Sequence, residues 1–272
     1  MLLYSSEVWG FDDCQTVESV QVRGMKMFCN VPTSTPNVML YGDCGRYPLY
    51  IGASIRIVKY WCRLLRMESS RYPVKVYKMM LHNIERGNNW ASQLREFLIR
   101  YNFESIWLAQ EVRNESAFIK ELKKSLIDRY HDKWISQLHS SNRYLLYKQL
   151  KQQPTLEKYL FLDKKVFREA YIKFRLGVSE LYNHKYRFNN ESSSVLCPSC
   201  QEEEEDDSHF LVECPAYEDL RCKYFRYLIN PTPLSYAAVL TSEETETVRG
   251  VSAYLFHAFK RRRCALEITE LE

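Results

Sequence analysis

Four residues near the C-terminus constrain this chain more than any other feature, because together they make a complete ligand set for a metal ion. They are Cys197, Cys200, His209 and Cys214, with the spacing C-x2-C-x8-H-x4-C. Three thiolates and one imidazole fill the tetrahedral coordination of Zn²⁺ and leave no position open for water. A closed site of this kind holds a fold together and does not activate a nucleophile. We therefore expect a structural zinc ion here, and not metal catalysis.

The same four residues admit a plainer interpretation, as ordinary buried cysteines and a surface histidine. The chain has nine cysteines, so a chance C-x2-C pair is not rare. A histidine and a third cysteine at ligand spacing directly after such a pair are much harder to obtain by chance. Cys222, eight residues beyond Cys214, is an alternative ligand, although burial in a helix is the simpler expectation for it.

Composition favours a globular protein with a sizeable core. The 272 residues are enough for one large or two modest domains, and 46% of them are hydrophobic. Only 8 glycines and 9 prolines argue against a loop-rich or all-β chain. No apolar run approaches the roughly 18 residues that span a bilayer, and we expect neither a signal peptide nor a membrane partner. The irregularly spaced cysteines indicate a reducing compartment, so the expected location is intracellular, nuclear or cytoplasmic.

Hydrophobic residues recur at spacings of three and four along most of the chain, which predicts a mainly α fold. In the strongest pattern, Glu115 to His139, six large side chains fall four residues apart: Phe118, Leu122, Leu126, Tyr130, Trp134 and Leu138. Such a stripe is typical of a helix face that packs into a core, so we assign no function to it. A basic amphipathic helix is predicted from Lys164 to Leu176, and Gly177 is its natural stop.

The net charge of +4 conceals an uneven distribution of charged residues. Between Gln201 and Leu220 lie nine acidic residues and no lysine or arginine, and six of the acids are consecutive, Glu202 to Asp207, named the acidic run below. The rest of the chain has 38 basic and 25 acidic residues, an excess that is compatible with a polyanionic partner. A mixed, solvated surface explains a modest excess equally well. The acidic run would repel a polyanion and is a candidate contact for a basic protein partner.

Two separated stretches resemble the C-terminal part of the reverse transcriptases of non-LTR (LINE-type) retrotransposons, downstream of the polymerase palm. The first stretch contains LLYSSEVWG and PNVMLYGDCGRYPLYIGASIRIVKYWCRLL and ends at about Met67. The second, Lys164 to Arg221, contains KFRLGVSELYNHKYRF, CPSC and HFLVECPAYEDLR, of which the last is the most specific. The resemblance does not extend to the middle of the chain, from about Ser69 to Leu162.

This resemblance implies that Leu2 to about Met67 is a helical thumb region. We therefore expect a helical thumb-like region over residues 1–140, a basic helix with a CCHC zinc-binding module over 141–229, and a C-terminal helix with a basic end over 230–272. The resemblance also implies that Cys197, Cys200, His209 and Cys214 bind zinc, and that the chain holds RNA or an RNA–DNA hybrid during target-primed reverse transcription. The candidate contacts to the nucleic acid are Lys173, Arg175, His184, Lys185 and Arg187. Aromatic rings between these residues can stack on unpaired bases, or they belong to the core while the charges solvate the opposite face.

Catalysis by this chain is not expected. The paired catalytic aspartates of the family's polymerase are missing, and Phe11-Asp12-Asp13 precedes a predicted helix, so we interpret Asp12 and Asp13 as its N-terminal cap. There is no Gly-rich phosphate loop, G-x-S-x-G or H-E-x-x-H motif. We therefore expect a nucleic-acid-binding chain that is not an enzyme in isolation. The alternative is a zinc-stapled protein–protein interaction module.

Overall fold

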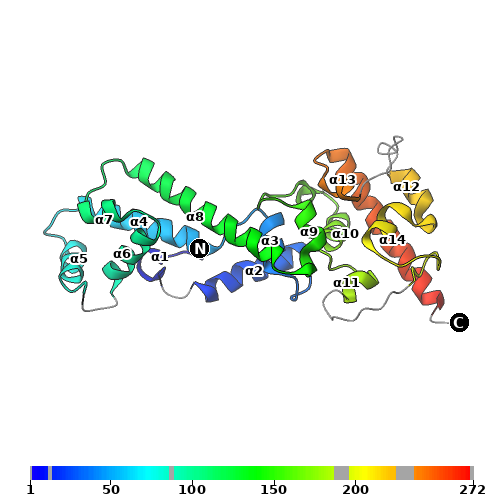
Figure 1. The fold of residues 1–272 in the computed structure, drawn as a ribbon, viewed down its shortest axis with the longest axis horizontal. Coiled ribbons are helices and arrows are strands. Elements are labelled where there is room, and N and C mark those ends of the chain that lie inside the picture. The colour runs from blue at the N-terminus through cyan, green and yellow to red at the C-terminus, as the bar shows by residue number, and fades with distance from the viewer. Residues whose placement is uncertain (1, 12–13, 86–88, 187–195, 225–235, 270–272) are drawn as a thin grey trace. The chain divides into compact units, whose positions relative to one another are not determined.

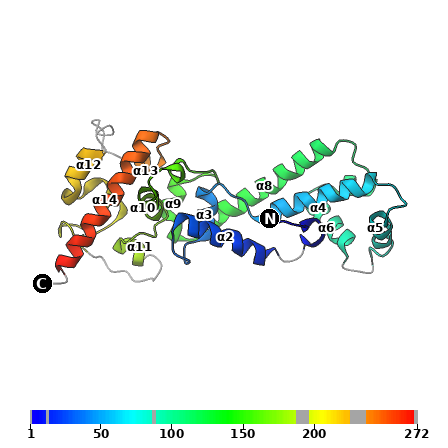
Figure 2. The ribbon, with the colours of Figure 1, turned by 180° about the vertical axis from the view of Figure 1, so that it is seen from behind.

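The computed structural model describes residues 2–11, 14–85, 89–186, 196–224 and 236–269 (Figures 1 and 2). Within these ranges the chain is mainly helical and has no sheet, which confirms the predicted mainly α fold. Extended segments pair there only as two isolated bridges, Cys44 with Leu156 and Leu196 with Glu204. The helix cap expected at Asp12 and Asp13 lies outside the described residues.

The chain divides into two compact units, and each of them is discontinuous in sequence. The first unit is Met1–Gln21 with Tyr47–Trp134, and the second is Val22–Arg46 with Ile135–Glu272. The segment 22–46 thus belongs with the C-terminal part of the chain. The regions expected from the sequence, with boundaries at residues 140 and 229, place this segment in the N-terminal region. The segment belongs to the second unit because of a buried polar network, described below.

The first unit has a core of helices and aromatic rings. Its helices are α1 (Ser6–Trp9), α4 (Leu49–Arg66), α5 (Tyr72–His82), α6 (Trp90–Arg100) and α7 (Glu104–Ala109), with the N-terminal parts of α2 (Gln15–Cys29) and α8 (Glu115–His139). Trp61 of α4 stacks on Trp107, with ring centres 5.8 Å apart, and its indole N–H donates to the Tyr77 hydroxyl at 2.8 Å. The six side chains of the predicted α8 stripe are each at most 7% exposed, which confirms that face as a core face.

The second unit is organised around its last helix. Its helices are α3 (Asn37–Asp43), α9 (Leu145–Leu150), α10 (Lys165–Arg175), α11 (Tyr182–Tyr186), α12 (Glu218–Tyr224), α13 (Tyr236–Thr241) and α14 (Thr245–Thr269), with single turns at Asn142–Tyr144, Lys158–Phe161, His209–Glu213 and Pro215–Tyr217. Helices α10, α12 and α13 all pack against α14 (Figure 1). Gly177 ends α10 as predicted: its φ is 64°, and the N–H groups of Gly177 and Val178 bond back to the carbonyls of Phe174 and Lys173.

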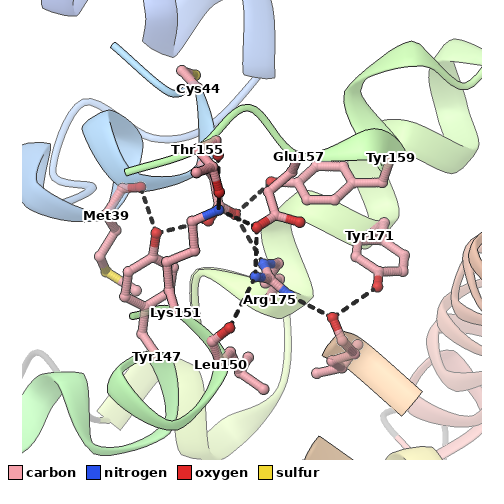
Figure 3. Close-up of polar contacts among 12 residues, drawn as sticks. Met39, Cys44, Tyr147, Leu150, Lys151, Thr155, Glu157, Tyr159, Tyr171 and Arg175 are labelled. Atoms are coloured by element: carbon pink, nitrogen blue, oxygen red, sulfur yellow. Dashed lines mark hydrogen bonds and ion pairs between the residues drawn. The ribbon is translucent and has the colours of Figure 1, made fainter. Parts of the chain in front are cut away.

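A buried polar network ties α3 to the C-terminal part of the second unit (Figure 3). The Asp43 carboxylate, fully buried, accepts hydrogen bonds from the hydroxyls of Tyr147 (2.7 Å) and Tyr159 (2.6 Å) and from Nε of Arg175 (3.1 Å). Arg175 also donates to Glu157 and to the backbone carbonyl of Leu240. These partners come from separate parts of the sequence, so the network holds the segment 22–46 in the second unit.

The charges of this network compensate one another. Burial raises the pKa of Tyr147 and Tyr159 well above the ordinary value, and the Asp43 carboxylate raises it further, so both phenols stay protonated and donate. Burial by itself would lower the pKa of Arg175, but the carboxylates of Asp43 and Glu157 outweigh it and raise that pKa. Removing one charged partner of such a buried group leaves the other without compensation, which is costly.

We expect Asp43→Asn to lower the free energy of unfolding of the second unit by about 3 kcal/mol, because it leaves Arg175 with a single carboxylate partner inside the protein. The matched control is Asp132→Asn, the same change at an exposed position of α8, which should cost no more than about 0.5 kcal/mol. Urea unfolding followed by circular dichroism measures both. Equal unfolding midpoints for the two variants would contradict the role given to Asp43.

Candidate metal centre

The first two candidate ligands lie on a tight reversal of the chain. The bridge between Leu196 and Glu204 closes this reversal, and the N–H of Cys197 donates to the carbonyl of Glu203 at 2.7 Å. Gln201, with a φ of 60°, turns the chain directly after Cys200, and its N–H bonds to the carbonyl of Cys197. The turn across Pro198 and Ser199 therefore brings Cys197 and Cys200 to the same side, as their two-residue spacing predicts.

The other two ligands lie at the two ends of one wide helical turn, His209–Glu213 and the residue after it. The carboxylate of Asp206 accepts the N–H of His209 at 2.7 Å and begins this turn. At its end the N–H of Cys214 bonds to the carbonyl of His209, five residues back, at 2.7 Å. An i to i+5 bond widens the turn and places His209 and Cys214 on one face. The four residues between His209 and Cys214 are thus the number that this wide turn contains between its two bonded ends.

The four side chains converge on one point. Their ligand atoms all lie within 4.8 Å of one another, with 3.8 Å between the sulfurs of Cys197 and Cys214 and 3.4 Å between Sγ of Cys200 and Nε2 of His209. Cys197, His209 and Cys214 are buried and Cys200 is partly buried. Cys197, Cys200, His209 and Cys214 could therefore hold a metal ion. Cys222 does not belong to this group: its side chain is exposed and donates to Glu218.

Electrostatics prepare this site for a cation. A hydrogen bond from the Cys214 thiol lowers the pKa of Cys197 to about 4, although burial of Cys197 opposes the change. The same hydrogen bond, together with burial, raises the pKa of Cys214. One thiol of this pair thus stabilises a thiolate on the other. A thiolate is the form of cysteine that binds metal ions.

Glu203 orients the histidine, a role that the sequence analysis missed. Its carboxylate lies 3.0 Å from Nδ1 of His209, on the side of the ring opposite Nε2. A carboxylate at one ring nitrogen holds the proton there and leaves the other nitrogen free to bind a metal. Glu203, His209 and Glu213 also lie close together, but they share His209 with the cysteine group and do not form a separate site. Within a run of six acids, nothing in the sequence singles out Glu203.

The loop that carries the ligands is fastened to α14 and α12. The Tyr254 hydroxyl of α14 donates to the carbonyl of Phe210, and Arg221 of α12 donates to the carbonyl of Cys214, both at 2.5 Å. Phe210 stacks on Phe259 of α14 with ring centres 4.9 Å apart. The candidate ligands and the packing of α14 are therefore parts of one local structure.

Two members of the acidic run are buried and paired, which the sequence analysis did not foresee. The Glu205 carboxylate forms a double hydrogen bond with Arg262 of α14 at 2.5 and 2.6 Å, and both side chains are fully buried. It also accepts the N–H of Tyr182 at 2.8 Å. Asp207, 7% exposed, bonds to Nε2 of His184. The acidic run is thus partly a structural element of the unit, while Glu202, Glu203, Glu204 and Asp206 remain exposed.

The residues predicted to contact nucleic acid fall into different environments. Arg175 and His184 are each 1% exposed and bonded to carboxylates, so neither can reach a phosphate in this structure. Lys185 is exposed. Lys173 is partly exposed and lines a pocket of about 150 Å³ together with Glu169, Glu180 and Arg263. Arg187 lies outside the described residues.

The basic run from Lys260 to Arg263 is mostly paired with acids, and Arg262 is its one buried member. Arg261 pairs with Asp219 at 2.5 Å, Arg262 is the buried partner of Glu205, and Arg263 pairs with Glu180 at 3.0 Å. Only Lys260 of these four shows no ion pair with the described residues. Four consecutive basic residues in the sequence therefore do not give four uncompensated positive charges on the surface of the fold.

Comparisons with family models, with curated proteins and with solved structures found no match. None of the described helices combines the length and the apolar character that crossing a bilayer requires. The interpretation of the site therefore depends on its own chemistry and on the resemblance stated above.

We expect Glu205→Gln to lower the free energy of unfolding of the second unit by about 3 kcal/mol, because Arg262 loses its buried counter-charge. Glu202→Gln is the matched control: it makes the same change three residues away at an exposed position, and should change stability by less than about 0.5 kcal/mol. Thermal and urea unfolding measure both. If the two variants behave alike, Glu205 is a solvated surface charge and not an internal partner.

Proposed function

We propose that Cys197, Cys200, His209 and Cys214 bind one structural Zn²⁺. A tetrahedral zinc ion with Zn–S bonds of about 2.3 Å has sulfur atoms about 3.8 Å apart and a sulfur–nitrogen separation of about 3.6 Å. The corresponding distances of 3.8 and 3.4 Å support this assignment. Soft thiolates favour zinc over magnesium or calcium, which prefer oxygen ligands. Because the protein supplies all four ligands, the ion would stabilise the fold and would not bind a reacting water.

We further propose that the chain is the C-terminal, nucleic-acid-binding part of a LINE-type reverse transcriptase, that it is not catalytic by itself, and that it acts inside the cell on RNA or an RNA–DNA hybrid. The observation that carries this proposal is the convergence of the four ligands that the resemblance implies. The burial of Glu205 and Asp207 also supports it, because two of the acids that would repel a phosphate backbone are bonded inside the protein, Glu205 to Arg262 and Asp207 to His184.

A protein-interaction module is the second candidate. Glu202, Glu203, Glu204 and Asp206 are exposed on the reversal that carries the first two ligands, where they could contact a basic protein. A stable complex with a basic partner that Glu202→Gln/Glu204→Gln abolishes, with RNA binding absent throughout, is the result that would favour this candidate over the first.

Metal analysis tests the zinc assignment. We expect the purified protein to retain a single zinc ion per chain and Cys200→Ser to lose it, with a fall in the thermal stability of the second unit. Affinity should also fall as the pH is lowered, because protons compete for thiolates and imidazole. Cys222→Ser, at an exposed cysteine outside the ligand group, is the control and should retain the ion. Equal zinc content in the two variants, or none in the parent protein, contradicts the assignment.

Salt-dependent RNA binding tests the nucleic-acid proposal. We expect an unstructured single-stranded RNA to bind with an affinity that falls steeply with salt, because cations released from phosphates drive the association. Lys173→Gln and Lys185→Gln should each lower the slope of log affinity against log salt by about 0.7. Lys124→Gln, at an exposed position of α8, is the control and should leave the slope unchanged. Fluorescence anisotropy measures the slopes, and the absence of salt-sensitive binding by the parent protein would exclude this function.

A further inference from the structure

Three lysines from separate parts of the second unit surround one histidine. Lys164 directly precedes α10, Lys223 lies on α12, and Lys260 lies on α14 one turn after His257; all three lysines are exposed. Burial lowers the pKa of His257, and the charges of Lys223, Lys260 and Lys164 lower it further. The charged groups that lower the pKa of His257 are thus lysines.

A framework of aromatic rings connects α10, α12 and α14 at this point. Tyr224 of α12 stacks on His257 of α14, with ring centres 5.4 Å apart and planes within 8°. From α10, Phe167 meets His257 edge-on at 6.2 Å. The ammonium group of Lys164 lies 4.9 Å from the centre of the Phe167 ring, and that of Lys223 lies 5.2 Å from the centre of the Tyr224 ring. Cation–π attraction thus keeps two of the lysines on the framework.

Among the described residues, the three lysines lack acidic partners, whereas several other exposed cations of the same unit have one. Several other exposed cations are paired: Lys158 with Glu243 at 3.1 Å, Lys165 with Glu169 at 3.6 Å, and Arg263 with Glu180 at 3.0 Å. Over the part of the chain that the structure describes, Lys164, Lys223 and Lys260 form no ion pair with a carboxylate. Three like charges held near one another raise the local positive potential and attract an anion.

We propose that Lys164, Lys223 and Lys260, named the lysine patch, bind the phosphate groups of a single-stranded RNA, with the partly exposed rings of Tyr224 and His257 available to an unpaired base. The inference rests on the proposed function and names the surface that performs it. A strand in which phosphates and flat bases alternate complements a surface of cations and aromatic rings. An acidic peptide would satisfy the lysines but has no comparable use for the rings.

The lysine patch is a better phosphate site than the residues chosen from the sequence. Arg175 and His184 are buried, and the pocket at Lys173 holds two basic and two acidic side chains, so it has no net positive charge. The lysine patch carries three positive charges, and no negative charge of the described residues contributes to the pKa shift of His257 between them. Its members are 96 residues apart at the extremes, which is why no local motif in the sequence reveals them.

The test compares two triple variants that remove the same formal charge from the same unit. The patch variant is Lys164→Gln/Lys223→Gln/Lys260→Gln, and the control is Lys158→Gln/Lys165→Gln/Arg263→Gln, whose members are ion-paired. Anisotropy with an unstructured single-stranded RNA gives the affinity of each full-length protein across a range of salt concentrations. We expect the patch variant to lose about 2 from the salt slope and to bind about tenfold more weakly at low salt, while the control stays within about twofold of the parent.

Each outcome decides a separate question, provided that zinc content and circular dichroism show both variants to be folded. Equal weakening in the two variants means that binding follows net charge, which overturns the lysine patch. Parental affinity in the patch variant overturns it as well and leaves the proposed function intact, whereas no RNA binding by the parent protein removes the proposed function itself. Displacement of RNA by polyglutamate at equal charge concentration would show a general polyanion surface and overturn the assignment to RNA.

Discussion

The second unit depends on how a strongly acidic loop is held against a helix. Six consecutive acids repel one another, and such a segment becomes ordered only when its carboxylates form ion pairs or hydrogen bonds with other groups. Here Glu205 is paired with Arg262, Asp207 bonds to His184, Asp206 begins the turn of His209, and Glu203 orients the His209 ring. The same four contacts set the positions of the metal ligands. The acidic run is therefore the part of the sequence that shapes the candidate metal centre.

Some of this structure could be predicted from the sequence, because the relevant signals are local. The spacing of Cys197, Cys200, His209 and Cys214 is set by one chain reversal and one wide turn, and the four-residue repeat of α8 is set by helix geometry. Gly177 as a helix stop follows from its freedom to adopt a positive φ. In each of these features, neighbouring members lie a few residues apart in the sequence, where spacing largely determines which face a side chain occupies.

The rest could not be predicted, because it depends on partners far apart in the chain. Arg175 lies on a basic amphipathic helix whose sequence predicts a phosphate-binding surface. In the fold its side chain is buried and paired with Asp43, which lies 132 residues earlier in the chain. Arg262 belongs to a run of four basic residues, but its partner Glu205 lies 57 residues earlier. A sequence pattern shows that a residue is charged, whereas only the fold shows whether that charge is neutralised. This is also why the unpaired lysines around His257 emerge from the structure and not from a motif.

The central claim is that a zinc ion coordinated by three sulfurs and one nitrogen organises this part of the protein. X-ray absorption spectroscopy at the zinc edge of the purified full-length protein tests it most directly, because it reports the type and distance of the ligands without requiring function. The account predicts three sulfur neighbours at about 2.3 Å and one nitrogen neighbour at about 2.0 Å. A first shell made mainly of oxygen atoms, or the absence of zinc from metal-replete protein, would contradict it.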